Sequence, residues 1–191
     1  MRGIDVARLF TPFPPPAAGE AAIVVSVAEQ RLYLFSGECL ERTFPISTSR
    51  FGVGGEAGSF KTPLGLHRIV RKIGAGAPWG TIFRGRRNTK RYWRPGDETA
   101  EDLILSRILR LSGLEPGRNR GEGCDSYDRF IYIHGTNQEA RIGTPASIGC
   151  IRMRNDDVID LFELVRGGAR RGTLVQIIEP PLEKAHAPRL P

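Results

Sequence analysis

Glycine and proline interrupt this chain so often that little room is left for long helices. Of its 191 residues, 23 are Gly and 14 are Pro, and both residue types end regular elements and mark turns. Short runs rich in Val, Ile, Leu and Phe lie between them, each about as long as a single strand. The sequence therefore predicts a turn-rich, mainly β fold rather than a helical bundle.

Prolines also concentrate at the two ends of the chain. Residues 1–20 hold four of them, and residues 180–191 hold four more. We expect both ends to be Pro-rich extensions without packed structure. The remaining segment, residues 21–179, is predicted to be one domain that is long enough to bury a core.

Composition excludes several classes of protein. Hydrophobic residues make up 40% and charged residues 26%, which is ordinary for a globular chain and too apolar for disorder. No apolar run approaches the ~18 residues of a membrane span, so no integral span is expected. The first residues lack the apolar stretch of a signal peptide. The net charge of +7 favours an anionic partner: nucleic acid, anionic lipid or an acidic polymer.

Six apolar runs are predicted to be strands: residues 22–27, 31–35, 39–46, 64–73, 129–134 and 173–178. The first three are separated by short polar turns and predict an antiparallel meander. Residues 103–111 fit a strand or a helix. Residues 74–95 show little periodicity and are expected to form a long loop, in which six of the eleven residues at 84–94 are basic.

One helix is predicted near the C-terminus. Asn155 is a suitable N-cap, acidic residues follow it in the first turn, and Gly167 and Gly168 would end the helix. An apolar stripe with helical spacing lies between these ends, formed by Val158, Leu161, Phe162 and Val165.

A His and a Cys stand at positions suited to nucleophilic chemistry. His134 ends an apolar run, and Cys150 follows sixteen positions later, between Gly149 and the predicted helix. The helix N-terminus, a nearby His and the cation Arg152 all favour a reactive thiolate. His134 is suited to take the thiol proton and return it to a leaving amine. Gly149 leaves room for the backbone of an oxyanion hole.

The alternative interpretation of this pair is structural, because a lone Cys or His is often part of a core. No Asp or Asn has the spacing of a third catalytic residue, so a backbone carbonyl would have to orient the imidazole. No metal or cofactor is expected, because no metal-ligand spacing relates His67, His134 and His186. Cys39 and Cys124 either pair in an oxidising compartment or are two buried thiols. We expect thiol reagents to label Cys150 before these two.

Together these residues resemble the L,D-transpeptidase catalytic domain (YkuD-type) family. Its signature is a His-Gly at a strand end followed, after a spacer, by Ser/Thr-x-Gly-Cys-x-Arg/Asn. The matching residues are His134-Gly135 and Ser147-x-Gly149-Cys150-x-Arg152, and residues 47–49 and 61–65 also look like family segments. The resemblance covers residues 23–178. It implies a single β-sandwich-type domain of mixed sheets with one α-helix packed after the nucleophile loop.

The resemblance also implies a role for each matching residue. Cys150 would be the nucleophile and His134 the general base, with the carbonyl of Gly135 orienting the imidazole. Three residues would position substrate or support the nucleophile loop: Ser147, Gly149 and Arg152. Some members carry a second His at the position of Ile148. The isoleucine side chain cannot form the hydrogen bonds that a His would form there.

The implied activity belongs to the periplasm or cell envelope. Cys150 would attack the carbonyl at the L-centre of diaminopimelate in a peptidoglycan tetrapeptide stem and release D-alanine. The acyl group would pass to an amine, giving a cross-link or attaching a lysine-bearing protein. The basic residues at 84–94 would either bind stem carboxylates or remain solvated.

Two other functions stay open. With water as acceptor, the same site would be an L,D-carboxypeptidase or a protein-releasing amidase. With a degenerate site, the domain would be a non-catalytic wall-binding module, although His134, Gly149, Cys150 and Arg152 are all intact. Nucleic acid is not expected as a partner, because neither a recognition helix nor an aromatic RNA-binding sheet is visible.

Overall fold

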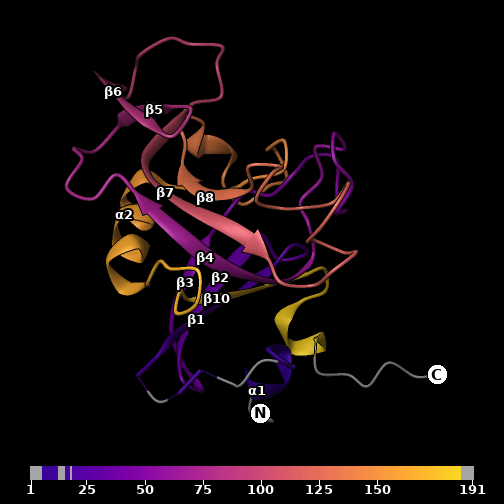
Figure 1. Ribbon diagram of the computed structural model, residues 1–191. Helices are drawn as coiled ribbons and strands as arrows, with labels where there is room; N and C mark the ends of the chain where they lie inside the picture. Colours follow the sequence, from indigo (N-terminus) through magenta and orange to yellow (C-terminus); the bar gives the residue numbers. More distant parts are fainter. Residues whose placement is uncertain (1–5, 13–15, 18, 186–191) are drawn as a thin grey trace.

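Ten strands in the part of the chain that the structure describes, residues 6–12, 16–17 and 19–185, form a single hydrogen-bonded sheet (Figure 1). In this computed structural model, helix α2 (Asn155–Leu164) packs against the sheet. The prediction of a mainly β fold with mixed pairing and one packed helix is confirmed. The strands are β1 Ala21–Ser26, β2 Arg31–Ser36, β3 Cys39–Pro45, β4 Gly65–Ile73, β5 Thr81–Arg84, β6 Arg87–Tyr92, β7 Ile104–Gly113, β8 Tyr132–Gly135, β9 Ile151–Met153 and β10 Leu174–Ile178.

The sheet closes on itself next to the predicted site. Its order runs β3-β2-β1-β10-β4-β7, and β8 and then β9 continue from β7. Just past β3, Ser47 and Arg152 of β9 exchange two backbone hydrogen bonds of 2.8 Å each. The pairs β1–β2 and β2–β3 form the predicted antiparallel meander, whereas β1–β10 and β8–β9 are parallel. The bridge at Ser47 therefore joins the two ends of this path around the main apolar core, to which β1, β7, β9 and α2 contribute.

Helix α2 has the predicted buried stripe but different ends. The stripe residues Val158, Leu161, Phe162 and Val165 are all buried in the main core. The predicted N-cap is wrong: Arg154 occupies that position, and Asn155 is the first helical residue, fully buried. The helix ends at Leu164, before Gly167, where the backbone of Val165 becomes extended. Lys72 Nζ donates to the Val165 carbonyl at 2.8 Å and so caps the C-terminus.

The segment 103–111, whose apolar residues fit both a strand and a helix, lies in strand β7 from Ile104 onward. Leu105 pairs with Gly135 and Ile108 pairs with His134, the neighbouring residue of β8. Ser106 and Arg107 therefore have no partner in β8 and form a β-bulge. Ser106 has a φ of 61°. This bulge moves the side chains out of simple alternation, which explains the ambiguous periodicity.

The expectation of a long loop over residues 74–95 is wrong. Strands β5 and β6 form an antiparallel hairpin there. They are joined by Gly85 and Arg86, whose φ values of 54° and 67° suit a two-residue hairpin turn. Every residue of β6 except Thr89 is exposed, so the hydrophobic alternation that identifies a strand is absent from the sequence.

The expectation of unpacked ends is wrong where the structure describes them. Residues Val6–Leu9 form the short helix α1, and Val6 and Phe10 are fully buried in a second apolar cluster with Val24 of β1. Near the other end, the 3-10 turn Leu182–Lys184 places Leu182 in the same cluster. Residues 186–191 of the predicted tail lie outside the described part.

Buried His67 is predicted to weaken the fold in mild acid. Its Nδ1–H donates to Gly65 O and its Nε2 accepts from Ser126 Oγ, both at 2.9 Å, and the side chain is fully buried. Burial lowers the pKa of His67 from 6.5 to about 4. Between these values the unfolded chain binds a proton that the folded chain does not. Stability present above pH 6.5 is therefore lost as the pH falls toward 4, by about 3 kcal/mol from this group.

Urea unfolding of the wild type and of His67→Gln across the same pH window tests this. The free energy of unfolding should fall more steeply with acid in the wild type than in the variant. Equal slopes for the two proteins would contradict it, whatever their difference in absolute stability.

Candidate active site

The parallel pairing of β8 with β9 brings His134 and Cys150 to one face of the sheet. His134 pairs with Arg152, and Ile133 pairs with Ile151. Both isoleucines are fully buried in the main core, so His134 and Arg152 point to the opposite face. Cys150 precedes Ile151 and returns to the face of His134, where its thiol donates to Phe130 O at 3.5 Å.

The imidazole of His134 is held in one tautomer. Its Nδ1 lies 2.8 Å from Gly135 O, and a carbonyl only accepts, so Nδ1 carries the hydrogen and Nε2 keeps its lone pair in the neutral ring. The side chain is 3% exposed. Burial lowers the pKa of His134, although the Gly135 carbonyl and the carboxylate of Asp102 act in the opposite direction. At neutral pH this ring is a neutral base.

The thiol of Cys150 is also neutral in the free protein. Burial raises its pKa from 9.0 to about 11, and Asp102 adds to the rise, while Arg152 and Arg129 oppose it. Cys150 packs beside an apolar cluster that includes Tyr132. This direction is opposite to the thiolate-favouring environment that the sequence suggests, because desolvation outweighs the nearby guanidinium groups.

Arg152 is buried in an ion pair rather than exposed to solvent. Its Nη1 lies 2.9 Å from Asp102 Oδ1 and 3.1 Å from Gln138 Oε1, and its Nη2 lies 3.5 Å from Ser47 Oγ. The residue is 1% exposed. These contacts hold the segment before β7 against the closed edge of the sheet, beside His134.

The Cys150 loop, residues 147–150, is held by internal hydrogen bonds. Ser147 Oγ donates to Cys150 O at 2.6 Å and accepts from the N–H of Gly149 at 3.2 Å. Gly149 has a φ of 124°, a conformation that favours glycine, and its carbonyl accepts from Thr62 Oγ1 at 3.0 Å. Ser147 and Gly149 thus shape the loop through their own contacts.

The two earlier segments that the sequence analysis singled out pack around this loop. The N–H groups of Ala146 and Ser147 both donate to Thr48 O at 2.9 Å. Thr62 Oγ1, which contacts the loop, also accepts from the N–H of Ser49 at 3.0 Å. Both segments, residues 47–49 and 61–65, therefore contribute hydrogen bonds that hold the Cys150 loop.

The family model for the L,D-transpeptidase catalytic domain matches residues 20–177 of this chain. The chain belongs to this family. It is 32% identical over 169 residues to the Salmonella typhimurium protein named "Probable L,D-transpeptidase ErfK/SrfK", covering 88% of this chain and 47% of that one. It is 29% identical over 174 residues to the Escherichia coli protein named "Probable L,D-transpeptidase YcfS", covering 91% and 48%. The chain therefore spans about half the length of these relatives.

The fold is shared with a solved member of the family. L,D-transpeptidase 3 from Mycobacterium tuberculosis, crystallised with a faropenem-derived adduct, superposes with a TM-score of 0.52 at 14% identity. The superposition covers 83% of this chain and 60% of that one. At this identity the likeness concerns the fold alone.

Sequence reasoning missed one residue that fixes the position of the L,D-transpeptidase motif. Asn155 Oδ1 accepts from Ser106 Oγ at 2.6 Å, and its Nδ2 donates to Thr136 O at 2.9 Å and to Glu139 Oε1 at 2.7 Å. A Cβ at Gly135 would lie 2.5 Å from Asn155 Oδ1. The position of Asn155 at the start of a helix suggests an N-cap in the sequence. Only the tertiary structure shows that its side chain joins Ser106, Thr136 and Glu139.

An exposed apolar rim beside the Cys150 loop was also missed. It consists of Phe51, Phe60, Phe130 and Ile148, which are 46%, 53%, 49% and 51% exposed. The rings of Phe51 and Phe60 lie 6.1 Å apart, and Cys150 contacts the backbone of Phe130. Clustered exposed apolar side chains mark binding surfaces. The sequence offers no signal for them, because exposure depends on the fold.

The tip of the β5–β6 hairpin reaches the same region. Arg86 Nη1 donates to Tyr132 Oη at 3.2 Å, and its guanidinium lies 4.9 Å from the centre of the Phe130 ring. Arg84, by contrast, forms an exposed ion pair with Glu101. Of the basic residues at 84–94, Arg86 is therefore the one whose contacts place it beside Cys150.

The other cysteines do not pair. Cys39 and Cys124 are free, and Cys39 is exposed, so neither a disulfide nor two buried thiols describes them. Within the described residues, no three His, Cys, Asp or Glu side chains gather as metal ligands, and no helix is long and apolar enough to cross a membrane. His186 lies outside that part of the chain.

The raised pKa of Cys150 reverses the expected order of thiol labelling. Only the thiolate reacts with iodoacetamide. At neutral pH exposed Cys39 should be alkylated first, and the Cys150 rate should rise about tenfold per pH unit well into alkaline pH, because its pKa is about 11. Peptide mass mapping measures both rates. A Cys150 rate that leads at neutral pH, or levels off in mild alkali, would contradict this prediction.

Proposed function

We propose that this chain is a cysteine L,D-transpeptidase that acts on the tetrapeptide stems of peptidoglycan. The observation that carries the proposal is the shared sheet face of Cys150 and His134, with the ring tautomer set by Gly135 O at 2.8 Å. Nε2 is left as a lone-pair base on the sheet face that also carries the thiol. This arrangement supports acyl transfer through a thioester, and transpeptidation is the activity in the family's name.

The chemistry needs two displacements at one carbonyl carbon. The thiol proton of Cys150 passes to His134 Nε2 as sulfur bonds to the stem carbonyl. The C–N bond to D-alanine then breaks, and the leaving amine takes the proton from the imidazolium. In the second step an acceptor amine attacks the thioester and gives its proton to His134. The C–S bond breaks and restores the thiol.

Substrate would bind across the apolar rim and beneath the hairpin tip. The rim residues Phe60 and Ile148 offer apolar contacts to the stem, and Arg86 offers a cation next to Cys150 for its carboxylates. The formal charge of +7 suits such a polymer. Amine acceptors include a second stem or the lysine of a protein, and this activity belongs in the periplasm or cell envelope.

Removing the proposed nucleophile should abolish turnover, and removing the proposed base should lower its rate. Cys150→Ala should leave no activity on purified muropeptides, because no sulfur remains to form the thioester. His134→Gln should lower the rate by about 10²–10⁴-fold, since an amide cannot take and return the proton. Mass spectrometry of the products measures both losses.

Matched variants separate chemistry from folding. Cys39→Ala should keep wild-type activity, because that thiol is exposed and outside the site. Retained turnover by Cys150→Ala would overturn the proposed function. The products also identify the acceptor: cross-linked dimers indicate an amine, whereas trimmed tripeptides indicate water and hence a carboxypeptidase.

The hairpin tip should influence acylation, not only polymer binding. Arg86→Gln removes the hydrogen bond to Tyr132 and the cation–π contact with Phe130. The hydrogen bond alone contributes about 0.5–1.5 kcal/mol. Acylation of Cys150 by a small carbapenem should slow about three- to tenfold. The neighbouring exposed residue Arg87 provides the control: in Arg87→Gln, Cys150 should be acylated at the wild-type rate. Intact-mass time courses measure this, and equal rates for all three proteins would exclude the hairpin from the site.

A further inference from the structure

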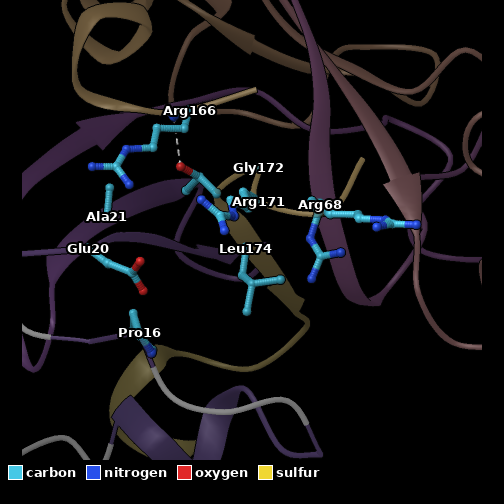
Figure 2. Close-up of a pocket in the computed structure, with 10 residues that line it drawn as sticks. Pro16, Glu20, Ala21, Arg68, Arg166, Arg171, Gly172 and Leu174 are labelled. Carbon is cyan, nitrogen blue, oxygen red and sulfur yellow. Dashed lines mark hydrogen bonds between the residues drawn. The ribbon is translucent and has the colours of Figure 1, made fainter. Parts of the chain in front are cut away.

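Four arginines line a cavity that no residue of the Cys150 loop enters. The cavity measures about 320 Å³ and lies where β1 and β10 begin side by side. Its charged lining consists of Arg68, Arg166, Arg170, Arg171 and Glu20. Figure 2 shows Arg166, Arg171 and Arg68 along one side, with Glu20 and Pro16 below them in this view.

The loop that carries three of these arginines, residues 166–172, is held in one shape. Its ends are joined by two hydrogen bonds, from Thr173 N to Arg166 O at 3.0 Å and from Arg166 N to Thr173 Oγ1 at 2.9 Å. A Cβ at Gly172 would lie 1.9 Å from Ile69 O, so the loop rests directly on β4. Arg68 Nη1 donates to Ala169 O at 3.1 Å and anchors the loop's centre.

Positive charge gathers on the loop side of this cavity, where Arg166, Arg170 and Arg171 line it. Within the described residues, the ion pairs at side-chain contact distance involve Arg42, Arg84, Arg118 and Arg152, and none of the arginines at 166–171. Glu20 is the single acid in the lining, and its carboxylate accepts from the N–H of Ala17 at 3.2 Å. The three loop arginines against Glu20 give a formal charge of +2. Like charges held together by a fixed loop repel one another until an anion binds.

We propose that this cavity binds a phosphate group, carried by a small phosphorylated molecule or by a lipid headgroup. Guanidinium groups pair with phosphate oxygens in bidentate geometry. A tetrahedral phosphate offers oxygens in several directions at once, whereas a planar carboxylate offers two. A concave site lined by Arg166, Arg170 and Arg171 therefore suits phosphate better than carboxylate.

Titration of isotope-labelled protein with inorganic phosphate, followed by backbone NMR shifts, tests the site. Saturable shifts should appear around residues 166–174, with a Kd of about 1 mM or tighter, and acetate at equal ionic strength should bind at least tenfold more weakly. In a second arm, the protein should sediment with phosphatidylcholine vesicles containing phosphatidylglycerol if a headgroup supplies the phosphate, and not with pure phosphatidylcholine. Binding of phosphate alone indicates a small ligand.

Two double variants distinguish a specific phosphate site from general attraction of anions to a positively charged protein. Arg170→Gln with Arg171→Gln should weaken phosphate or vesicle binding at least tenfold. Arg87→Gln with Arg91→Gln, which removes the same charge from exposed β6, should change it less than twofold. The proposal is overturned if neither probe binds, if acetate binds as well as phosphate, or if both double variants lose binding equally. Turnover of muropeptides is a separate measurement, so either proposal can fail without the other.

Discussion

The parallel pairing of β8 with β9 is the constraint on which the site depends. Two parallel strands that lie side by side need a crossover of a dozen or more residues, because the chain must return to the starting edge before it runs forward again. Residues 136–150 make this crossover, and Cys150 is its last residue. The sixteen-position spacing from His134 to Cys150 is thus the length of one return path. The register then determines that the thiol and the imidazole share a face.

A second constraint keeps the end of β8 close to its neighbours. At Gly135 a side chain would collide with Asn155 Oδ1 and with the backbone carbonyl of Leu105. The bulge in β7 puts Ser106 where it donates to the same Asn155 oxygen. Helix α2, the bulge and the strand end therefore meet at one point, and the Gly135 carbonyl that orients His134 is part of it. This packing requires glycine at position 135, whereas any residue there would supply the carbonyl.

What the sequence predicts well is whatever repeats along it or is fixed by local chemistry. The meander, the stripe of α2 and the residues of the Cys150 motif all have such signals, and strand ends differ from expectation by a few residues at most. Strand β6 gives no signal because almost all of its side chains are in water, and β7 gives an ambiguous one because of its bulge. Burial of Phe10, the ion pair of Arg152 and the rim at Phe60 depend on contacts between distant segments. No local pattern encodes those contacts.

Electrostatics at the site follow from this long-range burial. A Cys beside an Arg and a helix start suggests a resting thiolate, yet desolvation raises the pKa of Cys150 and lowers the pKa of His134. Both shifts favour the uncharged forms, so proton transfer from thiol to imidazole creates two charges at a site that resists each of them. Arg152 cannot offset this cost fully, because Asp102 is bonded to it and acts in the opposite direction on the thiol. In the proposed mechanism, the charged pair would be favoured only as the sulfur bonds to the stem carbonyl and so loses its negative charge. A thiol that stays protonated until substrate arrives is also protected from oxidation, which proceeds through the thiolate.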